Sequence, residues 1–415
     1  MTIFEKAKQI ELREQFAESR IKKRFAKNKR YTEDEIEAMC GYILSDGCVR
    51  DIERLENGDY YFDYPKYRLI PKNFQNKKRA IYLLEGDQAI LLKLLVYAMR
   101  GIERVYSDRL FSFRPDKTAT ELLHEITQLE DKSSLYVLKT DISNYVGSIV
   151  PELIVPMLEE VFLPDDPAFF RFLEWMLTRN KVRDVNGNII DHCAGGLGGL
   201  PVGNFFMNLY LHEMDEYYAP RAAFYSRYSD DVLICARTYE EICLFEKKFY
   251  EFLDRLRLST NKEKTMILQP GEAFDLLGME ICGDKIRISD HSMNKIKRKF
   301  RIYANKALVR KNRGQMTADE AAGALIARFN RLFFGVGGDS GKLTWAKWAF
   351  PVINDTDCLA ELDHYLQDSL RYVLYGSMKE RNKTIPYEKL KELGYRTLMY
   401  YYHHPDKVRE LIGEK

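Results

Sequence analysis

The sequence has neither the long hydrophobic runs nor the paired cysteines that several protein classes require. No apolar stretch reaches the roughly 18 residues of a membrane span, and the first 30 residues are charged throughout, unlike a secretory signal peptide. The seven cysteines are odd in number and scattered, and none forms a Cys-x-x-Cys pair. We therefore expect a cytoplasmic protein with reduced thiols, no membrane partner, no zinc knuckle and no disulfide framework.

The chain also has little net charge, +2 over 415 residues, but that charge is unevenly distributed. Basic residues gather in 20–30 and again in 291–313, where there is no Asp or Glu. Two basic segments in a nearly neutral chain suit a protein that binds a polyanion on selected faces. Two solvated helix faces would give the same pattern. The length allows several packed units around more than one core.

Hydrophobic periodicity predicts strands interleaved with helices, followed by a helical end. We expect strands in 60–83, 135–142 and 223–236, and helices in 1–30, 87–104, 151–180, 202–218, 242–258 and beyond about 290. A capping box at Thr32–Glu35 predicts a helix start, and Asn186-Gly187 predicts a hairpin turn with positive φ at both residues. This succession predicts an α+β fold whose subdomains are built from interleaved segments.

The strongest local signal is a pair of adjacent carboxylates, Asp230 and Asp231, between apolar flanks in the segment Arg-Tyr-Ser-Asp-Asp-Val-Leu-Ile. Adjacent ionised carboxylates repel, so a fold keeps such a pair between buried strands where a divalent cation neutralises it. A solvated surface turn is the plain alternative. A third carboxylate, Asp141, ends the apolar strand 135–142. Three Asp residues at neighbouring strand ends predict a site for two Mg²⁺ ions, with Mn²⁺ as an alternative.

This order of motifs resembles the palm of reverse transcriptases, and further blocks of the family follow in register. They are 67–72 with 78–79, 111–115, 195–204, 208–211, 261–265 and 274–280. The resemblance covers about residues 65–285 and implies an RNA-directed DNA polymerase that copies an RNA template into DNA from dNTPs. It implies a right-hand polymerase with an antiparallel palm sheet. The expected parts are a basic N-terminal helix (1–30), fingers (31–135 with part of 150–195), palm (136–285) and a helical thumb (286–415).

The resemblance also implies roles for individual residues. Asp141, Asp230 and Asp231 would be catalytic and would bind the metal ions together with Ile142. The residues expected to bind the nucleotide are Lys72, Arg79, Tyr145, Val146, Gly199, Pro201, Gly203 and Lys264. Leu277 and Gly278 would grip the primer end. A thumb helix would bind nucleic acid through Lys295, Lys297, Arg298, Lys299 and Arg301. The basic residues among these could equally be solvated strand or helix residues.

Two places depart from the family pattern. A gapless comparison puts 197–199 where the family has Pro-Gln-Gly, whereas matching 199–203 to Gly-x-Pro-x-Gly needs a gap. Five residues after Asp141, Val146 stands where the family has Phe or Tyr, whose ring leaves no room for a 2′-hydroxyl. In a strand, neighbouring side chains point to opposite faces, so Tyr145 would replace that ring only where the backbone bulges. We therefore predict weaker discrimination against ribonucleotides. The plain alternative is that Tyr145, or a residue from another segment, fills the gap.

Within the family, the short fingers, the absence of an appended nuclease and the segment 387–395 are most similar to bacterial enzymes of the unknown-group and defence-associated kind. Retron and group II intron enzymes are their relatives. This narrower resemblance implies a structured non-coding RNA partner and an antiphage role. Alternatives are RNA-dependent or untemplated nucleotide synthesis on the same palm, a non-catalytic RNA-binding relic, and a cyclic-dinucleotide synthase. The primer, which could be RNA, DNA or a protein tyrosine, and any protein partner are not given by the sequence.

Overall fold

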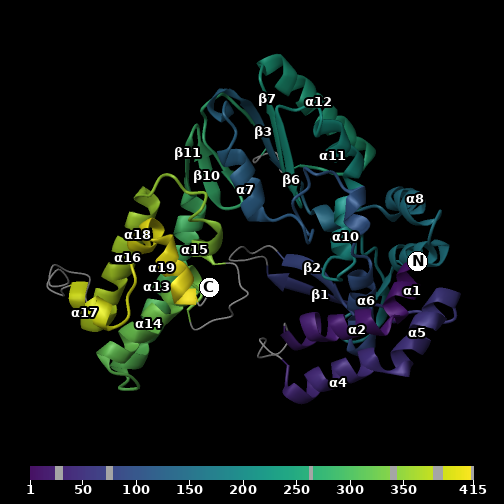
Figure 1. The fold of residues 1–415 in the computed structure, drawn as a ribbon, viewed down its shortest axis with the longest axis horizontal. Coiled ribbons are helices and arrows are strands. Elements are labelled where there is room, and N and C mark those ends of the chain that lie inside the picture. The colour runs from purple at the N-terminus through teal and green to yellow at the C-terminus, as the bar shows by residue number, and fades with distance from the viewer. Residues whose placement is uncertain (24–30, 72–77, 261–264, 337–343, 377–386, 413–415) are drawn as a thin grey trace. The chain divides into compact units, whose positions relative to one another are not determined.

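The computed structural model describes residues 1–23, 31–71, 78–260, 265–336, 344–376 and 387–412 (Figure 1). The chain divides into two compact units. Unit 1 comprises Met1–Lys117 and Val137–Ile267, and unit 2 comprises Thr118–Tyr136 and Leu268–Lys415. Each unit is thus built from two separate stretches of the chain. The boundaries of fingers, palm and thumb stay a prediction.

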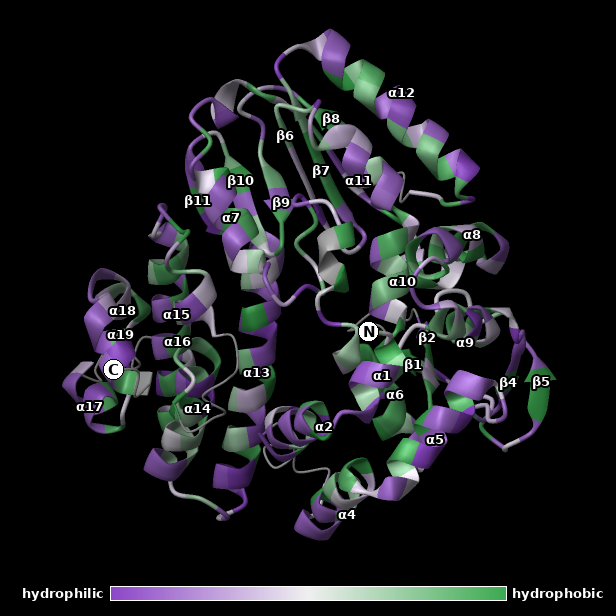
Figure 2. Ribbon diagram, turned by 45° about the vertical axis from the view of Figure 1, so that its right-hand side comes forward, coloured by the Kyte–Doolittle hydropathy of each residue, from purple (hydrophilic) through white to green (hydrophobic). Residues whose placement is uncertain are grey.

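A four-stranded sheet in the order β6-β7-β3-β8 positions the acidic residues. Its strands are β6 (Phe224–Tyr228), β7 (Asp231–Ala236), β3 (Tyr136–Asp141) and β8 (Met266–Leu268). β6 and β7 pair antiparallel, as the strand–turn–strand pattern predicted. All of Val232–Ala236 is buried, and Figure 2 shows hydrophobic residues along β7. Helix α11 (His212–Tyr218) packs on β6, and the amphipathic α12 (Tyr239–Arg255) packs on β7.

A second sheet of unit 1 has the order β2-β1-β4-β5. β1 (Lys66–Pro71) and β2 (Lys78–Leu83) pair antiparallel, and β4 (Lys181–Arg183) and β5 (Ile189–Asp191) form a hairpin. The predicted hairpin at Asn186-Gly187 is present, but only Gly187 has a positive φ, of 88°. The Asp184 carboxylate accepts hydrogen bonds from the N–H groups of Asn186 and Asn188, which closes a longer loop than the expected two-residue turn.

Helices complete unit 1. They are α1 (Ile3–Lys8), α2 (Ile10–Phe16), the π-helix η1 (Ala17–Lys22), α4 (Glu33–Leu44), α5 (Asp46–Asn57), α6 (Gly86–Ala98), η2 (Ile102–Val105), η4 (Tyr145–Ser148), α8 (Pro151–Phe162), α9 (Pro167–Thr178) and α10 (Gly203–Tyr210). The single helix expected over 1–30 is wrong in the described part, because Gln9 is extended and separates α1 from α2. The Asp166 carboxylate accepts from the Ile3 N–H at 2.6 Å, which ties α1 to the start of α9.

Unit 2 contains a three-stranded sheet and a helical bundle. The sheet, in the order β11-β10-β9, is formed by β9 (Phe274–Leu276), β10 (Met279–Cys282) and β11 (Lys285–Ile288). The helices are α7 (Ala119–Thr127), η3 (Lys132–Ser134), α13 (Asp290–Asn312), α14 (Ala318–Phe333), α15 (Trp345–Trp348), α16 (Asp357–Tyr375), α17 (Tyr387–Glu392), α18 (Leu398–His403) and α19 (Pro405–Ile412). α13, α14 and α16 pack side by side (Figure 1), which confirms the predicted helical end.

Apolar residues of the three long helices of unit 2 meet in their common core. Phe300 on α13 and Phe329 on α14 are both buried, with ring centroids 5.7 Å apart. The rest of α13 alternates between hydrophilic and hydrophobic residues (Figure 2). Among the residues that the structure describes, no helix is both long enough and apolar enough to cross a membrane.

Candidate active site

The turn between β6 and β7 carries the adjacent carboxylates. Tyr228 pairs with Asp231 in the hairpin register, so Ser229 and Asp230 form a two-residue turn in which Ser229 has a φ of 61°. At the end of β3, the Ile142 N–H donates to the Asp230 carbonyl at 3.0 Å. This backbone contact brings the Asp141 strand end and the Asp230 turn to the same edge of the sheet.

The three carboxylates make this edge strongly acidic. Burial raises the pKa of Asp230, and the negative charges of Asp141 and Asp231 raise it further. Asp231 is paired with Lys139, whose Nζ lies 2.5 Å from Asp231 Oδ1, and the two side chains are 12% and 32% exposed. Over the described stretches of the chain, no three His, Cys, Asp or Glu side chains are grouped so as to hold a metal ion. In this arrangement Lys139 supplies the positive charge that Asp231 requires.

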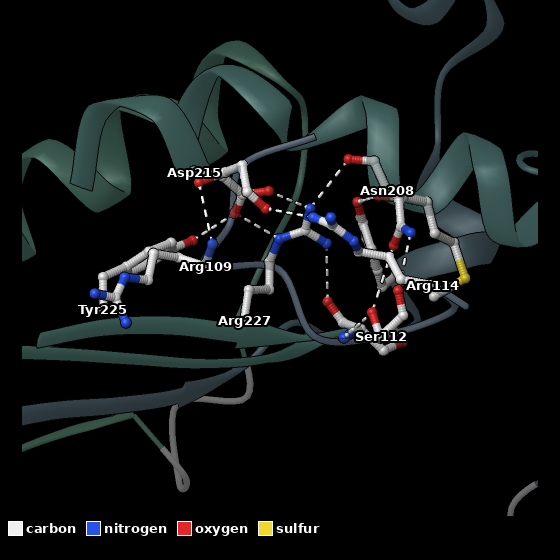
Figure 3. A network of polar contacts seen from close by, with 11 residues as sticks. Arg109, Ser112, Arg114, Asn208, Asp215, Tyr225 and Arg227 are labelled. Atoms are coloured by element: carbon white, nitrogen blue, oxygen red, sulfur yellow. Dashed lines mark hydrogen bonds and ion pairs between the residues drawn. The ribbon is translucent and has the colours of Figure 1, made fainter. Parts of the chain in front are cut away.

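A buried ion pair lies directly behind the turn (Figure 3). The Arg227 guanidinium donates from Nε and Nη2 to both carboxylate oxygens of Asp215 on α11, at 2.7 and 2.5 Å, and both side chains are 0% exposed. The Tyr225 hydroxyl also donates to Asp215, at 2.6 Å. Although burial lowers the pKa of Arg227, the charge and hydrogen bonds of Asp215 outweigh burial and raise it above the ordinary value. Arg227 is therefore charged at any working pH.

The remaining donors of Arg227 bind backbone oxygens. Nη2 donates to the Asn208 carbonyl at 3.0 Å, and Nη1 donates to the Ser229 carbonyl at 3.3 Å. Sequence reasoning quoted Arg227 only as part of the acidic motif and gave no role to Asp215. The available signal was an arginine among apolar residues in a strand that was expected to be buried, because a buried charge requires a partner.

Residues 145–148 do not have the strand geometry on which the expected facing of Tyr145 and Val146 depended. Asn144 has a φ of 47°, and Tyr145–Ser148 form a turn of 3-10 helix. Tyr145 is 3% exposed, and its hydroxyl donates to the Met207 carbonyl. Val146 is half-buried and lies against the glycine-rich loop: its carbonyl accepts from the Gly196 N–H at 2.8 Å. The Tyr145 ring thus packs in the core, while Val146 faces the loop.

Close backbone approach explains the glycines of this loop. A Cβ on Gly198 would lie 3.0 Å from Val146 Cγ1, and a Cβ on Gly203 would lie 2.7 Å from the Gly196 carbonyl oxygen. Gly199 has a φ of 101°, and the Tyr82 N–H on β2 donates to the Gly198 carbonyl at 2.8 Å. The loop therefore joins β2 to the Asp141 segment. Pro201 in the same loop is half-buried.

Of the other three residues expected to bind the nucleotide, the structure describes one. Arg79 is exposed on β2, where it pairs with Ile70 of β1. Lys72 and Lys264 lie outside the described residues. Glycines of both alignments, the one that uses 197–199 and the one that uses 199–203, pack closely against neighbouring atoms. The conformation of the loop is therefore compatible with either alignment.

The expected primer-grip and thumb residues belong to unit 2. Leu277 and Gly278 form the turn between β9 and β10, with φ of 52° and 85°, and the Gly278 carbonyl accepts from the Ser289 N–H at 3.0 Å. On α13, four of the five basic residues are exposed: Lys295, Arg298, Lys299 and Arg301. Lys297 differs, because it is half-buried and pairs with Glu361 of α16.

Comparison with known protein families gives a match over the middle of the chain. A family described as reverse transcriptase (RNA-dependent DNA polymerase) matches residues 70–281, which is about half of the chain. The chain belongs to the reverse transcriptase family. Its mixed α+β fold is the palm fold of that family. Among curated proteins, none matches the sequence of this reverse transcriptase.

Solved telomerase structures are distantly similar to this reverse transcriptase. One is apo telomerase from Candida tropicalis truncated from its C-terminal domain, at 13% identity and a TM-score of 0.42, over 54% of this chain and 55% of that chain. Another is the apo enzyme of the same organism, at 11% and 0.44, over 80% and 61%. A third, from Candida albicans in complex with a TWJ fragment of telomeric RNA, gives 12% and 0.42, over 90% and 69%. The chain thus spans little more than half the length of the first two.

Proposed function

We propose that this reverse transcriptase extends a primer 3′ end by two-metal nucleotidyl transfer at Asp141, Asp230 and Asp231. The observation that carries the proposal is the meeting of carboxylates from two distant segments at one sheet edge. The Asp230 carbonyl accepts from Ile142, and its carboxyl pKa is raised by burial and by both other acids. Such mutual repulsion is relieved by a divalent cation, for which carboxylate oxygens are the preferred ligands.

The donor set fits Mg²⁺, with Mn²⁺ as an alternative. Asp141, Asp230 and the Ile142 carbonyl would hold the ions, and Asp231 would join them by exchanging its contact with Lys139. When bound, the ions would lower the pKa of the attacking hydroxyl and neutralise charge on the phosphates. The protein itself supplies the rigid turn: the backbone contact between Ile142 and Asp230 fixes the separation of the two strand ends before any ligand arrives.

The incoming dNTP would lie between the glycine-rich loop, Val146 and β2. The close packing of Gly196 and Gly198 on Val146 supports this placement, with Gly199, Pro201 and Gly203 shaping the loop and Tyr145 backing it from the core. We assign phosphate binding to Arg79, Lys72 and Lys264. The Tyr145 hydroxyl is hydrogen-bonded to the Met207 carbonyl, so the small side chain of Val146 would be the one beside the sugar of the nucleotide. A small side chain there favours weak exclusion of a 2′-hydroxyl.

Duplex binding would fall to unit 2. The turn at Leu277 and Gly278 would contact the primer end, and the exposed basic residues of α13 would contact phosphates, as a basic helix does in a non-specific nucleic-acid interface. Lys297 would contribute least, since Glu361 already neutralises it. In this assignment unit 1 holds most of the expected fingers and most of the expected palm, and unit 2 holds the expected thumb.

The biological setting of the proposal rests on sequence resemblance. The likeness to unknown-group and defence-associated bacterial enzymes supports a cytoplasmic enzyme that copies a structured non-coding RNA in antiphage defence. Sequencing the nucleic acid that copurifies with the protein tests this part, because template, product and primer would be read together. Recovery of DNA complementary to one structured RNA is expected, whereas random cellular RNA without a DNA copy would contradict it.

Polymerisation on defined templates tests the chemistry. Wild type should incorporate labelled dTTP on poly(rA) primed with oligo(dT) when Mg²⁺ or Mn²⁺ is added. Asp230→Asn should lower the rate by at least about 10³-fold, because charge stabilisation by the ions is the main catalytic contribution. Asp254→Asn is the matched control, because it makes the same change at an exposed position of α12, and it should keep full activity. Equal activity of Asp230→Asn and Asp254→Asn would refute the assignment.

A further inference from the structure

Ser229 is the residue whose backbone sets the direction of Asp230. Its φ of 61° is unfavourable for any residue with a Cβ, so the surrounding structure has to impose it. Both of its backbone groups have partners outside the β6–β7 pairing: the N–H donates to Ser112 Oγ at 2.8 Å, and the carbonyl accepts from Arg227 at 3.3 Å. The side chains of Ser112 and Arg227 therefore hold the turn in place through the Ser229 backbone.

Ser112 is itself fixed by its surroundings. It is 0% exposed, its hydroxyl donates to Asn208 Oδ1 at 3.4 Å, and the Asn208 amide donates to its carbonyl at 3.0 Å. One residue earlier, the Phe111 N–H donates to the Arg227 carbonyl at 2.9 Å. Figure 3 shows Ser112 and Asn208 on one side of the Arg227 guanidinium and Asp215 on the other. A single buried hydroxyl thus joins the segment between η2 and α7, helix α10 and the Asp230 turn.

We propose that Ser112 is a positioning residue for polymerisation: its hydroxyl oxygen holds Ser229 in the left-handed conformation and so aims Asp230. The Ser112 hydroxyl accepts a hydrogen bond from the Ser229 N–H and donates one to Asn208, so it acts as acceptor and donor at the same time. Asn208 lies on α10, which begins directly after the glycine-rich loop. Ser112 therefore acts on the chemical step through the backbone of Ser229, which sets the direction of Asp230. The proposal rests on the polymerase activity of the family and goes beyond the roles assigned above.

Comparing Ser112→Ala with Ser107→Ala tests the proposal. Ser107 is a matched control because it is buried in the same segment, but its hydroxyl accepts from the Arg109 N–H at 3.3 Å and does not reach the turn. Single-turnover extension of an RNA-templated DNA primer would give the maximal rate and the dNTP dissociation constant separately. A misplacement of about 1 Å at a reacting group costs on the order of 10²-fold in rate. Ser112→Ala should therefore lose about 10- to 100-fold in maximal rate with an unchanged dissociation constant, and Ser107→Ala should lose neither.

A second measurement is independent of activity. Hydrogen exchange of peptides that cover 226–231 should be faster in Ser112→Ala than in wild type or Ser107→Ala, because the Ser229 N–H loses its acceptor. If Ser112→Ala shows no cooperative thermal transition, Ser112→Cys replaces it, since a thiol keeps the shape but accepts weakly. An unchanged maximal rate in the folded variant would overturn the proposal. So would a loss confined to dNTP affinity, or equal losses in Ser107→Ala.

Discussion

Breaking the Arg227–Asp215 pair should destabilise unit 1 far more than removing both charges together. Arg227→Met deletes both hydrogen bonds from the guanidinium to the Asp215 carboxylate, which is 0% exposed in the intact pair and also accepts from the Tyr225 hydroxyl. Removing one partner of a buried pair costs about 3–5 kcal/mol. Asp215→Asn should cost a similar amount, because it leaves the Arg227 charge buried without compensation.

The double variant Arg227→Met/Asp215→Asn removes both charges of this buried pair. Each single variant includes the cost of one uncompensated charge, and the double variant includes neither. Its loss should therefore fall short of the sum of the single losses by about 3 kcal/mol, as expected for directly interacting residues. Lys248→Met with Glu251→Gln, an exposed pair on α12, is the matched control and should couple by no more than about 1 kcal/mol.

Native-state hydrogen exchange of peptides from β6 and β7 is the suitable assay. Because the chain has two compact units, one-step unfolding is not expected, and a single denaturation midpoint would mix their stabilities. Exchange in the strands reports the opening of the sheet that holds the pair. If the double variant is as unstable as the sum of the single variants, the pair does not stabilise this sheet through its charges, and the reasoning fails.

Three further outcomes follow from the site. Lys139→Met should tighten binding of Mn²⁺ alone by about fivefold (~1 kcal/mol), because Asp231 loses its internal counter-charge; unchanged affinity in an EPR titration would contradict this. Val146→Phe should raise the ratio of kcat/KM for dCTP over CTP on one template, and strong rejection of CTP by wild type together with an unchanged ratio would exclude Val146 as the determinant. Neutralising three exposed residues of α13 should flatten the salt dependence of RNA–DNA duplex binding by roughly two to three units of log K per log salt; an unaltered slope would mean a solvated face. The residues to be neutralised on α13 are Lys295, Arg298 and Lys299.

The sequence by itself determined the elements whose signals are local. Strand ends with carboxylates, the capping box at Thr32 and Glu35, and the amphipathic pattern of α12 depend on neighbours within a few residues, and all are present. The acidic motif was recognisable for the same reason: two adjacent Asp residues between apolar strands are chemically unusual wherever they occur. The order of the blocks then sufficed to indicate the family.

The tertiary structure decided which side chains support the motif, because those contacts join residues far apart in the chain. Ser112 reaches Ser229 across 117 positions, and Lys139 reaches Asp231 across 92, and no local pattern encodes either pairing. The Tyr145 segment shows the same limit. Tyr145 and Val146 were expected to point to opposite faces of a strand, but Asn144 is left-handed, the chain continues as a 3-10 helix, and Tyr145 lies in the core. Local residue order therefore set the chemistry at the sheet edge, while long-range packing decided how its carboxylates are held.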